Sequence, residues 1–391
     1  MVDNQLEYAI YPRIYKPPGG SFFLFGPRGV GKSTWSRQTF PESRRFDLLD
    51  ESLYQSYLVD PETFAAELRM LSPGAWVVVD EIQRIPGLLN LVHRFIEEKR
   101  LRFVMLGSSA RKLKTAGTNL LAGRALKKTM FPLLPEELGT DFNLERVLAF
   151  GSLPVIVQAE SKEQTLRAYV ELYLKEEIRA EALVRNLGGF SRFLPIAALF
   201  HAQGINTAAL ARDAGVARTT VNGYLDILED TLLAFRVPAF DARLRVRERR
   251  HPKLYWIDPG LVRAVKKYVG PLGIEEKGAL LEGWVATLLR AYGEIRGILD
   301  EMYYWAPAEA HQTEVDFVLK LGKEYVAIEV KSSARVSSKD FSGLRAIKDL
   351  AGVRRRVLIY NGHREMKTED GIEIWPAAFF AQMLAADRLW P

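Results

Sequence analysis

The sequence predicts an α/β protein of several domains, and three observations lead to this prediction. A glycine-rich motif follows an apolar run near the N-terminus, at residues 26–34. A pattern of two short helices around a glycine turn covers residues 205–229. A helical stripe and two strand-like runs that carry acidic residues cover residues 278–331. Strands that alternate with helices are typical of α/β domains.

The composition is that of an ordinary globular protein. The chain has 391 residues, 48% hydrophobic and 26% charged, so we expect two or three domains. It has no cysteine, which excludes disulfides and thiolate metal sites, and its five histidines show no metal-ligand spacing. The sequence shows neither a signal peptide nor a run that could span a membrane, so we expect a cytoplasmic protein. The net charge of +6 permits nucleic-acid binding.

The glycine-rich motif fits G-x-x-x-x-G-K-[ST], the pattern of a phosphate-binding loop. Residues 21–25 predict a buried strand before it, and residues 32–38 predict a helix after it. The glycines allow backbone N–H groups to surround phosphates, and the helix N-terminus adds its positive dipole end. We expect Lys32 to reach the β- and γ-phosphates of ATP and Ser33 to hold Mg²⁺. The predicted nucleotide contacts in this loop are Gly26, Pro27, Arg28, Gly29, Val30, Gly31, Lys32, Ser33 and Thr34.

Two acidic residues end another apolar run. Residues 45–49 predict a second strand, and residues 75–81 predict a third that ends in Asp80 and Glu81. A buried parallel strand reads as a continuous apolar run, and ligands gather at the carboxyl ends of such strands. We therefore expect Asp80 to help hold Mg²⁺ and Glu81 to orient or polarise the attacking water. A surface turn after a core strand is the alternative.

Small polar residues follow the next predicted strand, at residues 101–109. In P-loop ATPases a polar residue at this place can sense the γ-phosphate. Ser108 is the candidate for this role, with Ser109 next. Either serine could instead cap a following helix, and the two roles are compatible.

These motifs resemble those of AAA-type ATPases that carry a C-terminal nuclease-like domain of uncharacterised function. The resemblance covers nearly the whole chain. Its matching segments are residues 26–34, 80–83 with Pro86, 106–109, 121–124, 150–154 and 173–178. It implies an AAA+ fold with ATP hydrolysis.

The resemblance also suggests that Arg124 completes an ATP site, either its own or that of a neighbouring subunit. An arginine supplied in trans stabilises transition-state charge across an interface, so it requires an oligomer. We therefore expect a homo-oligomer formed through the AAA+ domains. The residues alone leave a structural or solvated arginine open, because Arg124 stands at the start of a strand-like segment, residues 125–131.

Residues 163–186 form a helix-rich segment to which we assign no chemistry. Apolar residues recur there at three- and four-residue steps, and charged residues fill the other face. We expect a lid or linker that packs against the ATPase domain.

Residues 205–229 predict a helix-turn-helix. A short helix, a turn at Gly215 and a second helix follow one another, with a spacing that suits a shared apolar face. That face would consist of Leu210, Val216, Val221, Tyr224, Leu225 and Leu228. Recognition helices touch bases near their N-terminal end. The residues there are Arg218, Thr219, Thr220 and Asn222, the predicted DNA contacts.

Two further predicted strands, residues 231–237 and 253–257, flank the most basic loop of the chain. With the helix-turn-helix they predict a winged helix. Side chains alternate along an extended segment, so every second arginine of the loop would share one face. These arginines are Arg243, Arg245, Arg247 and Arg249. Such a face suits contacts with DNA phosphates, while packing against another protein or domain is the alternative.

An acidic constellation lies near the C-terminus. The predicted helix at residues 278–291 places Glu282 on its apolar stripe, where a carboxylate is costly unless it is paired or binds a cation. Two predicted strands follow, the first with Asp316 and the second with Glu329 and Lys331. Residues two apart on a strand share a face, so Glu329 and Lys331 point the same way.

This pattern resembles the core of PD-(D/E)xK nucleases. By that resemblance Asp316 and Glu329 bind Mg²⁺, and Glu282 completes the acidic shell directly or through water. Lys331 would help to activate or orient the attacking water. Hard cations take oxygen ligands and lower the pKa of bound water, which agrees with these residue types.

The sequence also departs from the nuclease pattern. Val315 stands where the family has proline, and Glu314 shares a strand face with Asp316 and is an alternative ligand. Two other interpretations therefore stay open. One is a salt-bridged acidic cluster, and the other is a nuclease fold that binds without cutting.

The predicted organisation has four parts. Residues 1–140 form an AAA+ P-loop ATPase domain, 141–190 a helical lid or linker, 191–270 a winged helix-turn-helix domain, and 271–391 a PD-(D/E)xK nuclease-like domain. We expect an ATP-hydrolysing protein that uses Mg²⁺ and acts on duplex, single-stranded or branched DNA, which its last domain cuts or grips. The alternative is an ATP-dependent switch or a branched-DNA motor whose last domain only binds.

Overall fold

The computed structural model describes residues 11–109, 111, 113, 123–174, 187–241, 251–307 and 313–391. The chain forms two compact units, which are described separately. The N-terminal unit contains residues 12–131 and 227–233. The C-terminal unit contains Tyr11 and the described residues of 132–226 and 234–391. Within the described residues, no helix has the length and apolar character needed to cross a membrane.

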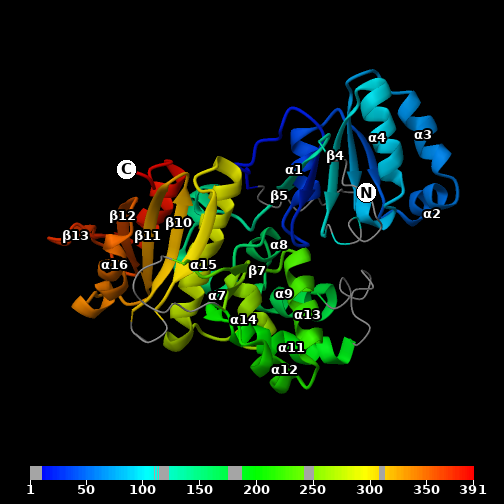
Figure 1. Ribbon diagram of the computed structural model, residues 1–391. Helices are drawn as coiled ribbons and strands as arrows, with labels where there is room; N and C mark the ends of the chain where they lie inside the picture. Colours follow the sequence, from blue (N-terminus) through cyan, green and yellow to red (C-terminus); the bar gives the residue numbers. More distant parts are fainter. Residues whose placement is uncertain are drawn as a thin grey trace. The chain divides into compact units, whose positions relative to one another are not determined.

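A parallel sheet forms the centre of the N-terminal unit (Figure 1). Its strands are β1 (Phe22–Phe25), β2 (Arg44–Asp47), β3 (Trp76–Asp80), β4 (Arg102–Gly107) and β5 (Leu126–Thr129). The order in space is β2-β3-β4-β1-β5, and every neighbouring pair is parallel. All the carboxyl ends of the strands therefore lie on one edge, where ligands of such sheets bind.

Helices cover both faces of this sheet (Figure 1). They are α1 (Lys32–Thr39), α2 (Glu51–Val59), α3 (Pro61–Arg69) and α4 (Leu88–Lys99), with a 3₁₀ turn η1 (Ile82–Arg84). The alternation of side chains along β1 explains the two layers. Phe22 packs edge-on against Trp35 of α1, while Phe23 and Phe25 belong to the core formed with α2, α3 and α4. The predicted strands around residues 21–25, 45–49, 75–81 and 101–109 are confirmed.

The C-terminal unit begins with a helical region. Its elements are α6 (Pro135–Leu138), η2 (Gly139–Asp141), α7 (Leu144–Phe150), α8 (Pro154–Val157), α9 (Lys162–Ala168), the π-helix η3 (Tyr169–Leu174), α11 (Leu187–Leu199), α12 (Thr207–Ala214), α13 (Arg218–Asp230) and α14 (Pro259–Val265). The last residues of α13, 227–230, belong to the N-terminal unit. The helix predicted from residue 163 is thus confirmed as far as residue 174, and residues 175–186 lie outside the described part.

The predicted helix-turn-helix pattern is present as α12, a turn and α13. Gly215 ends α12 in the left-handed conformation, with φ of 62°, which suits glycine. A small antiparallel sheet accompanies these helices, with β6 (Gln203–Gly204), β7 (Ala234–Val237) and β8 (Lys253–Trp256) in the order β6-β8-β7. The strand predicted from residue 231 begins only at Ala234, because Leu232 takes a left-handed conformation with φ of 59°.

A six-stranded sheet forms the remainder of the C-terminal unit. Its strands are β9 (Glu301–Trp305), β10 (Val315–Leu321), β11 (Glu324–Lys331), β12 (Val353–Tyr360), β13 (Met366–Lys367) and β14 (Glu373–Pro376), in the order β13-β14-β12-β11-β10-β9. Strands β9, β10 and β11 pair antiparallel, whereas β11, β12 and β14 pair parallel. The accompanying helices are α15 (Ile274–Arg296), η4 (Ser338–Phe341), α16 (Ser342–Ala346), η5 (Ile347–Asp349) and α17 (Ala377–Ala385).

Candidate functional site

The glycine-rich loop joins β1 to α1 at the carboxyl edge of the parallel sheet. Gly29 and Gly31 have φ of 74° and 94°, a region that glycine occupies without strain. A Cβ at Gly26 would lie 2.7 Å from the backbone oxygen of Met130, so the loop passes too close to β5 for a side chain. Within the loop, Val30 is buried, while the predicted nucleotide contacts Arg28 and Thr34 are exposed.

The Lys32 ammonium lies against the loop itself. Its side chain is buried, and Nζ donates to the backbone oxygens of Gly26 at 2.7 Å and Pro27 at 3.3 Å. These contacts hold a positive charge at the centre of the loop. A buried ammonium among backbone groups is a fitting partner for phosphate oxygens.

Ser33 and Asp80 meet across the same edge. The Ser33 hydroxyl donates to Asp80 Oδ2 at 2.5 Å, although the two residues are separated by almost fifty positions in the chain. The last residues of β2 and β3 pair in register, which places Asp47 beside Asp80. A hydroxyl and a carboxylate at this separation are the oxygen donors that Mg²⁺ takes, so these residues fit a nucleotide-bound Mg²⁺.

Glu81 follows Asp80 in a conformation that is unusual for its residue type. Its φ of 57° and ψ of 43° lie in the left-handed region, which costs a non-glycine residue about 1 kcal/mol or more. Such strain gathers at functional sites, where surrounding contacts hold it. The Gln83 amide supplies one such contact, since its Nε2 donates to the Glu81 carboxylate.

Gln83 also connects Glu81 to β4. Its Nε2 donates to Ser108 Oγ at 3.2 Å, and both side chains are buried. A Cβ at Gly107 would lie 2.5 Å from Gln83 Oε1, so glycine is needed there for the amide to fit. Ser109 instead accepts from the backbone N–H of Arg111 at 3.0 Å, a capping contact. Sequence reasoning assigned no role to Gln83, although its position after the acid pair was the available signal.

Arg124 lies on the surface of the N-terminal unit. Its Nε donates to Glu97 of α4, and this ion pair lowers the pKa of the Glu97 carboxyl. The side chain of Arg124 is 43% exposed. Its role in completing an ATP site therefore stays a prediction, and the arginine must leave Glu97 to act in one.

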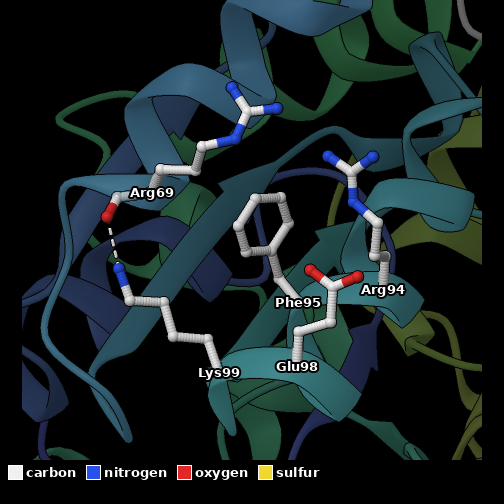
Figure 2. Close-up of a pocket in the computed structure, with 5 residues that line it drawn as sticks. All are labelled: Arg69, Arg94, Phe95, Glu98 and Lys99. Carbon is white, nitrogen blue, oxygen red and sulfur yellow. Dashed lines mark hydrogen bonds between the residues drawn. The ribbon is translucent and has the colours of Figure 1, made fainter.

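An open pocket of about 440 Å³ lies elsewhere on the N-terminal unit (Figure 2). Its lining residues are Arg69, Arg94, Phe95, Glu98 and Lys99. Lys99 is tied to the backbone oxygen of Arg69. None of the residues predicted to bind nucleotide lines this pocket.

The predicted DNA contacts on α13 lie at its N-terminal end. Arg218, Thr219 and Asn222 are exposed, and Thr220 is partly buried. Arg218 Nε donates to Thr207 Oγ1 at 3.0 Å, which ties the two helices of the pair together. The four remaining predicted contacts lie outside the described residues. They are Arg243, Arg245, Arg247 and Arg249.

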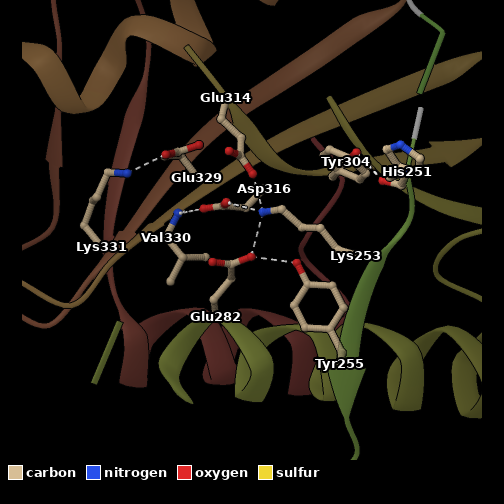
Figure 3. Close-up of polar contacts among 10 residues, drawn as sticks. All are labelled: His251, Lys253, Tyr255, Glu282, Tyr304, Glu314, Asp316, Glu329, Val330 and Lys331. Atoms are coloured by element: carbon tan, nitrogen blue, oxygen red, sulfur yellow. Dashed lines mark hydrogen bonds and ion pairs between the residues drawn. The ribbon is translucent and has the colours of Figure 1, made fainter. Parts of the chain in front are cut away.

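The acidic constellation of the C-terminal unit comes together from several elements. Asp316 of β10 and Glu329 of β11 are buried side chains. Asp316 Oδ2 accepts from the backbone N–H of Val330 at 2.9 Å, and the Lys331 ammonium donates to Glu329 Oε1 at 2.5 Å. The four residues predicted from the nuclease resemblance thus line one site, in which Glu282 of α15 joins Asp316, Glu329 and Lys331 (Figure 3).

A lysine that sequence reasoning did not place here occupies the middle of this site (Figure 3). Lys253, the first residue of β8, donates from Nζ to Glu282 Oε1 at 2.9 Å and to Asp316 Oδ1 at 3.2 Å, and it also pairs with Glu314. Tyr255, two residues further along β8, donates its hydroxyl to Glu282 Oε1 at 2.6 Å. Because side chains two apart share a strand face, β8 presents both groups to the acids.

Burial and neighbouring charges shift the protonation of these groups. Burial alone would lower the pKa of Lys253, but the carboxylates of Glu282, Asp316 and Glu314 outweigh it and raise that pKa, so the group stays charged. Burial, with repulsion from Asp316, raises the pKa of Glu282 to about 7. The same causes raise the pKa of Glu329 well above its usual range.

This arrangement does not fit the Mg²⁺ predicted at Asp316 and Glu329. Asp316 Oδ1 already accepts from a buried ammonium, that of Lys253, so a cationic group occupies the position that Mg²⁺ would take. Among the fully buried side-chain atoms described, the cluster offers a single carboxylate oxygen without a hydrogen bond, Glu329 Oε2. In the described part of the chain, no group of three or more histidines or acids is arranged to hold a metal ion.

A buried aspartate contacts residues 150–154, one of the segments that resemble the AAA-type ATPase family. Asp258 caps α14 and accepts from the backbone N–H of Ser152 at 2.7 Å and of Leu261 at 3.2 Å. A Cβ at Gly151 would lie 1.9 Å from Asp258 Oδ1, and Gly151 has φ of 80°. This motif is therefore explained by packing and backbone geometry.

Comparisons with known protein families divide the chain into three parts. Residues 19–139 match the AAA domain family. This part of the chain is an AAA-type ATPase domain. Residues 141–277 match a domain of unknown function, DUF8612, and residues 277–380 match another, DUF4143.

Two proteins of similar sequence match most of the chain. An uncharacterized protein of Mycobacterium tuberculosis, Rv2008c, is 27% identical over 362 residues, which cover 90% of this chain and 79% of that protein. An uncharacterized protein of Haemophilus influenzae is 23% identical over 347 residues, which cover 83% and 82%.

Similarities to solved structures are weaker. The ORC2 protein of Aeropyrum pernix in its ADP form has 15% identity and a TM-score of 0.30, with coverage of 56% of this chain and 81% of that chain. Protein VC1899 of Vibrio cholerae has 13% identity and a TM-score of 0.24, with coverage of 94% and 97%. At these TM-scores the similarities carry no inference about function.

Proposed function

We propose that this chain is an ATP-hydrolysing protein that acts on DNA, in which the AAA domain controls the C-terminal unit. The observation that carries the ATPase part is the 2.5 Å contact between Ser33 and Asp80 beside the phosphate-binding loop. It brings a hydroxyl and a carboxylate to the carboxyl edge of the parallel sheet, next to the buried Lys32 ammonium. When bound there, Mg²⁺ would neutralise charge on the nucleotide phosphates.

The residues of the AAA domain have separate roles in this proposal. Lys32 binds phosphate oxygens, while Ser33 and Asp80 hold the cation. Glu81 orients the attacking water, and Gln83 holds the Glu81 carboxylate through its amide. Ser108 senses the γ-phosphate, and the Gln83 amide, which contacts both Ser108 and Glu81, couples this serine to the acid. Arg124 completes an ATP site, either its own or that of a neighbouring subunit in a homo-oligomer.

DNA binding is proposed for the helix pair α12–α13. Arg218, Thr219 and Asn222 are exposed at the N-terminal end of α13, as recognition residues are. Phosphate contacts from Arg243, Arg245, Arg247 and Arg249 would add affinity without sequence preference. The C-terminal unit grips DNA in this proposal, because its acidic site does not fit the Mg²⁺ that cutting requires.

An ATPase assay with different DNA forms tests this proposal. The purified chain should release phosphate from ATP with Mg²⁺, and one form among single-stranded, duplex and branched DNA should accelerate the release. Changing Arg245, Arg247 and Arg249 together to alanine should weaken that stimulation and reduce the salt dependence of binding. ATP hydrolysis that no DNA form alters would favour the alternative, an ATP-dependent switch that recruits a protein partner.

A further inference from the structure

The acid cluster of the C-terminal unit is organised around one ammonium group. Three carboxylates converge on Lys253 Nζ: Glu282 from α15, Asp316 from β10, and Glu314 just before β10 (Figure 3). An ammonium has three N–H donors, so three carboxylate partners match its hydrogen-bonding capacity. The side chain of Lys253 is 7% exposed, which removes water as a competing partner.

The surrounding contacts fix this lysine in place. Lys253 begins β8, whose pairing with β7 joins Lys253 to Val237 in register. Tyr255 of the same strand donates to the Glu282 oxygen that Lys253 also contacts. The Lys253 ammonium lies 5.4 Å from the centre of the Tyr304 ring, a cation–π distance. The ammonium is thus held by the sheet, the tyrosines and the acids together.

Without this ammonium the cluster would lose one of the two cations described around it. In the described part of the chain, four carboxylates, including Glu329, face Lys253 and Lys331, and Lys331 is paired with Glu329. Leaving buried carboxylates without a partner is costly, so they then neutralise or bind a cation. Clustered carboxylate oxygens are the ligands of hard divalent cations.

We propose that Lys253 is the resident cation of this cluster and takes the place of a divalent metal, so that the C-terminal unit holds its carboxylates without metal. Loss of the ammonium lets the same carboxylates close around a hard divalent cation, an arrangement that they do not have while Lys253 lies between them. Glu282, Glu314 and Asp316 supply its oxygen ligands. In this proposal the DUF4143 region acts as a binding module rather than as a metal-dependent hydrolase, because Lys253 occupies the centre of its acidic cluster.

Mn²⁺ binding to the nucleotide-free protein tests the proposal, with Mn²⁺ as a paramagnetic probe. The wild-type chain and its Asp316→Asn variant should bind equal amounts of Mn²⁺. The Lys253→Met variant, which keeps the length of the apolar stem, should gain one Mn²⁺ per chain. The double variant Lys253→Met with Asp316→Asn should lose that gain. Lys277→Met is the matched control, because it removes an ion-paired ammonium outside the cluster.

Thermal unfolding gives a second readout. EDTA should leave the melting temperature of the wild-type chain unchanged, whereas Mn²⁺ should raise that of Lys253→Met. Mn²⁺ bound by the wild-type chain and lost in Asp316→Asn would overturn the proposal, and so would a folded Lys253→Met variant that gains none. If Lys253→Met does not fold, the comparison of Mn²⁺ binding between the wild-type chain and Asp316→Asn still tests the proposal. Because nucleotide is absent, the result does not depend on ATP hydrolysis.

Discussion

The Ser33 hydroxyl donates to Asp80 Oδ2 at 2.5 Å across the carboxyl edge of the parallel sheet. This contact joins the start of α1 to the end of β3 and sets two oxygen ligands side by side. It connects the two sequence motifs of the AAA domain in one site. The first predictions concern this pair and its neighbours.

Replacing either member of the pair should impair Mg²⁺-dependent hydrolysis. Ser33→Ala removes the hydroxyl ligand and Asp80→Asn removes the negative charge of the carboxylate, so we expect the rate of ATP hydrolysis to fall about 100-fold in each variant. Phosphate release measured over a range of Mg²⁺ concentrations checks this. Ser56→Ala, on the exposed side of α2, is the control. Full ATP hydrolysis by both variants would show that Ser33 and Asp80 do not hold the Mg²⁺ needed for the reaction.

Gln83→Ala should slow hydrolysis without preventing nucleotide binding. The amide holds Glu81 and contacts Ser108, so its loss frees the acid that orients water. We expect kcat to fall about 10-fold while KM for ATP changes little. Gln55→Ala, an exposed glutamine on α2, is the control. A change confined to KM would assign Gln83 to nucleotide binding instead.

Gly151→Ala should destabilise the C-terminal unit strongly. The new Cβ would meet the Asp258 carboxylate, in addition to a cost of about 1 to 3 kcal/mol for alanine at φ of 80° and ψ of −173°, a region that essentially only glycine adopts. Gly139→Ala is the comparison, because Gly139 also lies outside the left-handed helical region, with φ of 54° and ψ of −123°, and has no heavy atom within 4 Å of its added Cβ. Urea unfolding should show a clearly larger loss for Gly151→Ala. Equal losses would mean that the close approach to Asp258 costs nothing.

Asp258 should also give the stability a defined pH dependence. Burial raises its pKa from 3.8 to about 6 in the folded protein, partly offset by backbone N–H donors. The folded state therefore binds the proton more tightly than the unfolded state between these values. The contribution to stability is complete below about pH 4 and is lost as the pH rises to about 6, a change of about 3 kcal/mol.

Comparison with Asp258→Asn isolates this contribution. The stability of the wild-type chain relative to the variant should fall between pH 4 and pH 6 and stay level above that range. Asp213→Asn, at an exposed position on α12, should track the wild-type chain throughout. A difference that rises with pH would mean that the Asp258 pKa is lowered by folding.

Arg218→Ala should weaken DNA binding by about 10-fold if α13 is the recognition helix. Arg218 is exposed near the N-terminal end of α13. Arg212→Ala removes an equally exposed arginine from α12, outside the proposed contact surface. Titration of labelled duplex DNA at fixed salt measures both. Equal affinities of Arg218→Ala, Arg212→Ala and wild type for DNA would indicate that the helix pair contacts a protein instead of DNA.

The sequence predicted the features that depend on local pattern. The phosphate-binding loop, the apolar strands and the strand at residues 324–331 depend on short-range spacing, and the structure has them at the expected places. The acids of the C-terminal unit were also brought together as expected. The cation among them was not foreseen, because no local pattern connects Lys253, at the start of the predicted strand at residues 253–257, with these acids.

The reason is that the contacts of Lys253 join distant parts of the chain. Its partners lie on α15, on β10 and just before β10, and the pairing of β8 in its small sheet directs the ammonium toward them. Period-two alternation with Tyr255 was the one local signal that both side chains share a face. Gln83 was missed for a similar reason, since its partner Ser108 lies on another strand.

ATP hydrolysis by the purified chain, compared with its Lys32→Ala variant, tests the central claim most directly. Lys16→Ala is the control, since it removes an exposed lysine from the same unit. The account predicts Mg²⁺-dependent phosphate release by the wild-type chain and by Lys16→Ala, and its loss in Lys32→Ala. Phosphate release that persists in Lys32→Ala, or none from the wild-type chain with every DNA form, would contradict it.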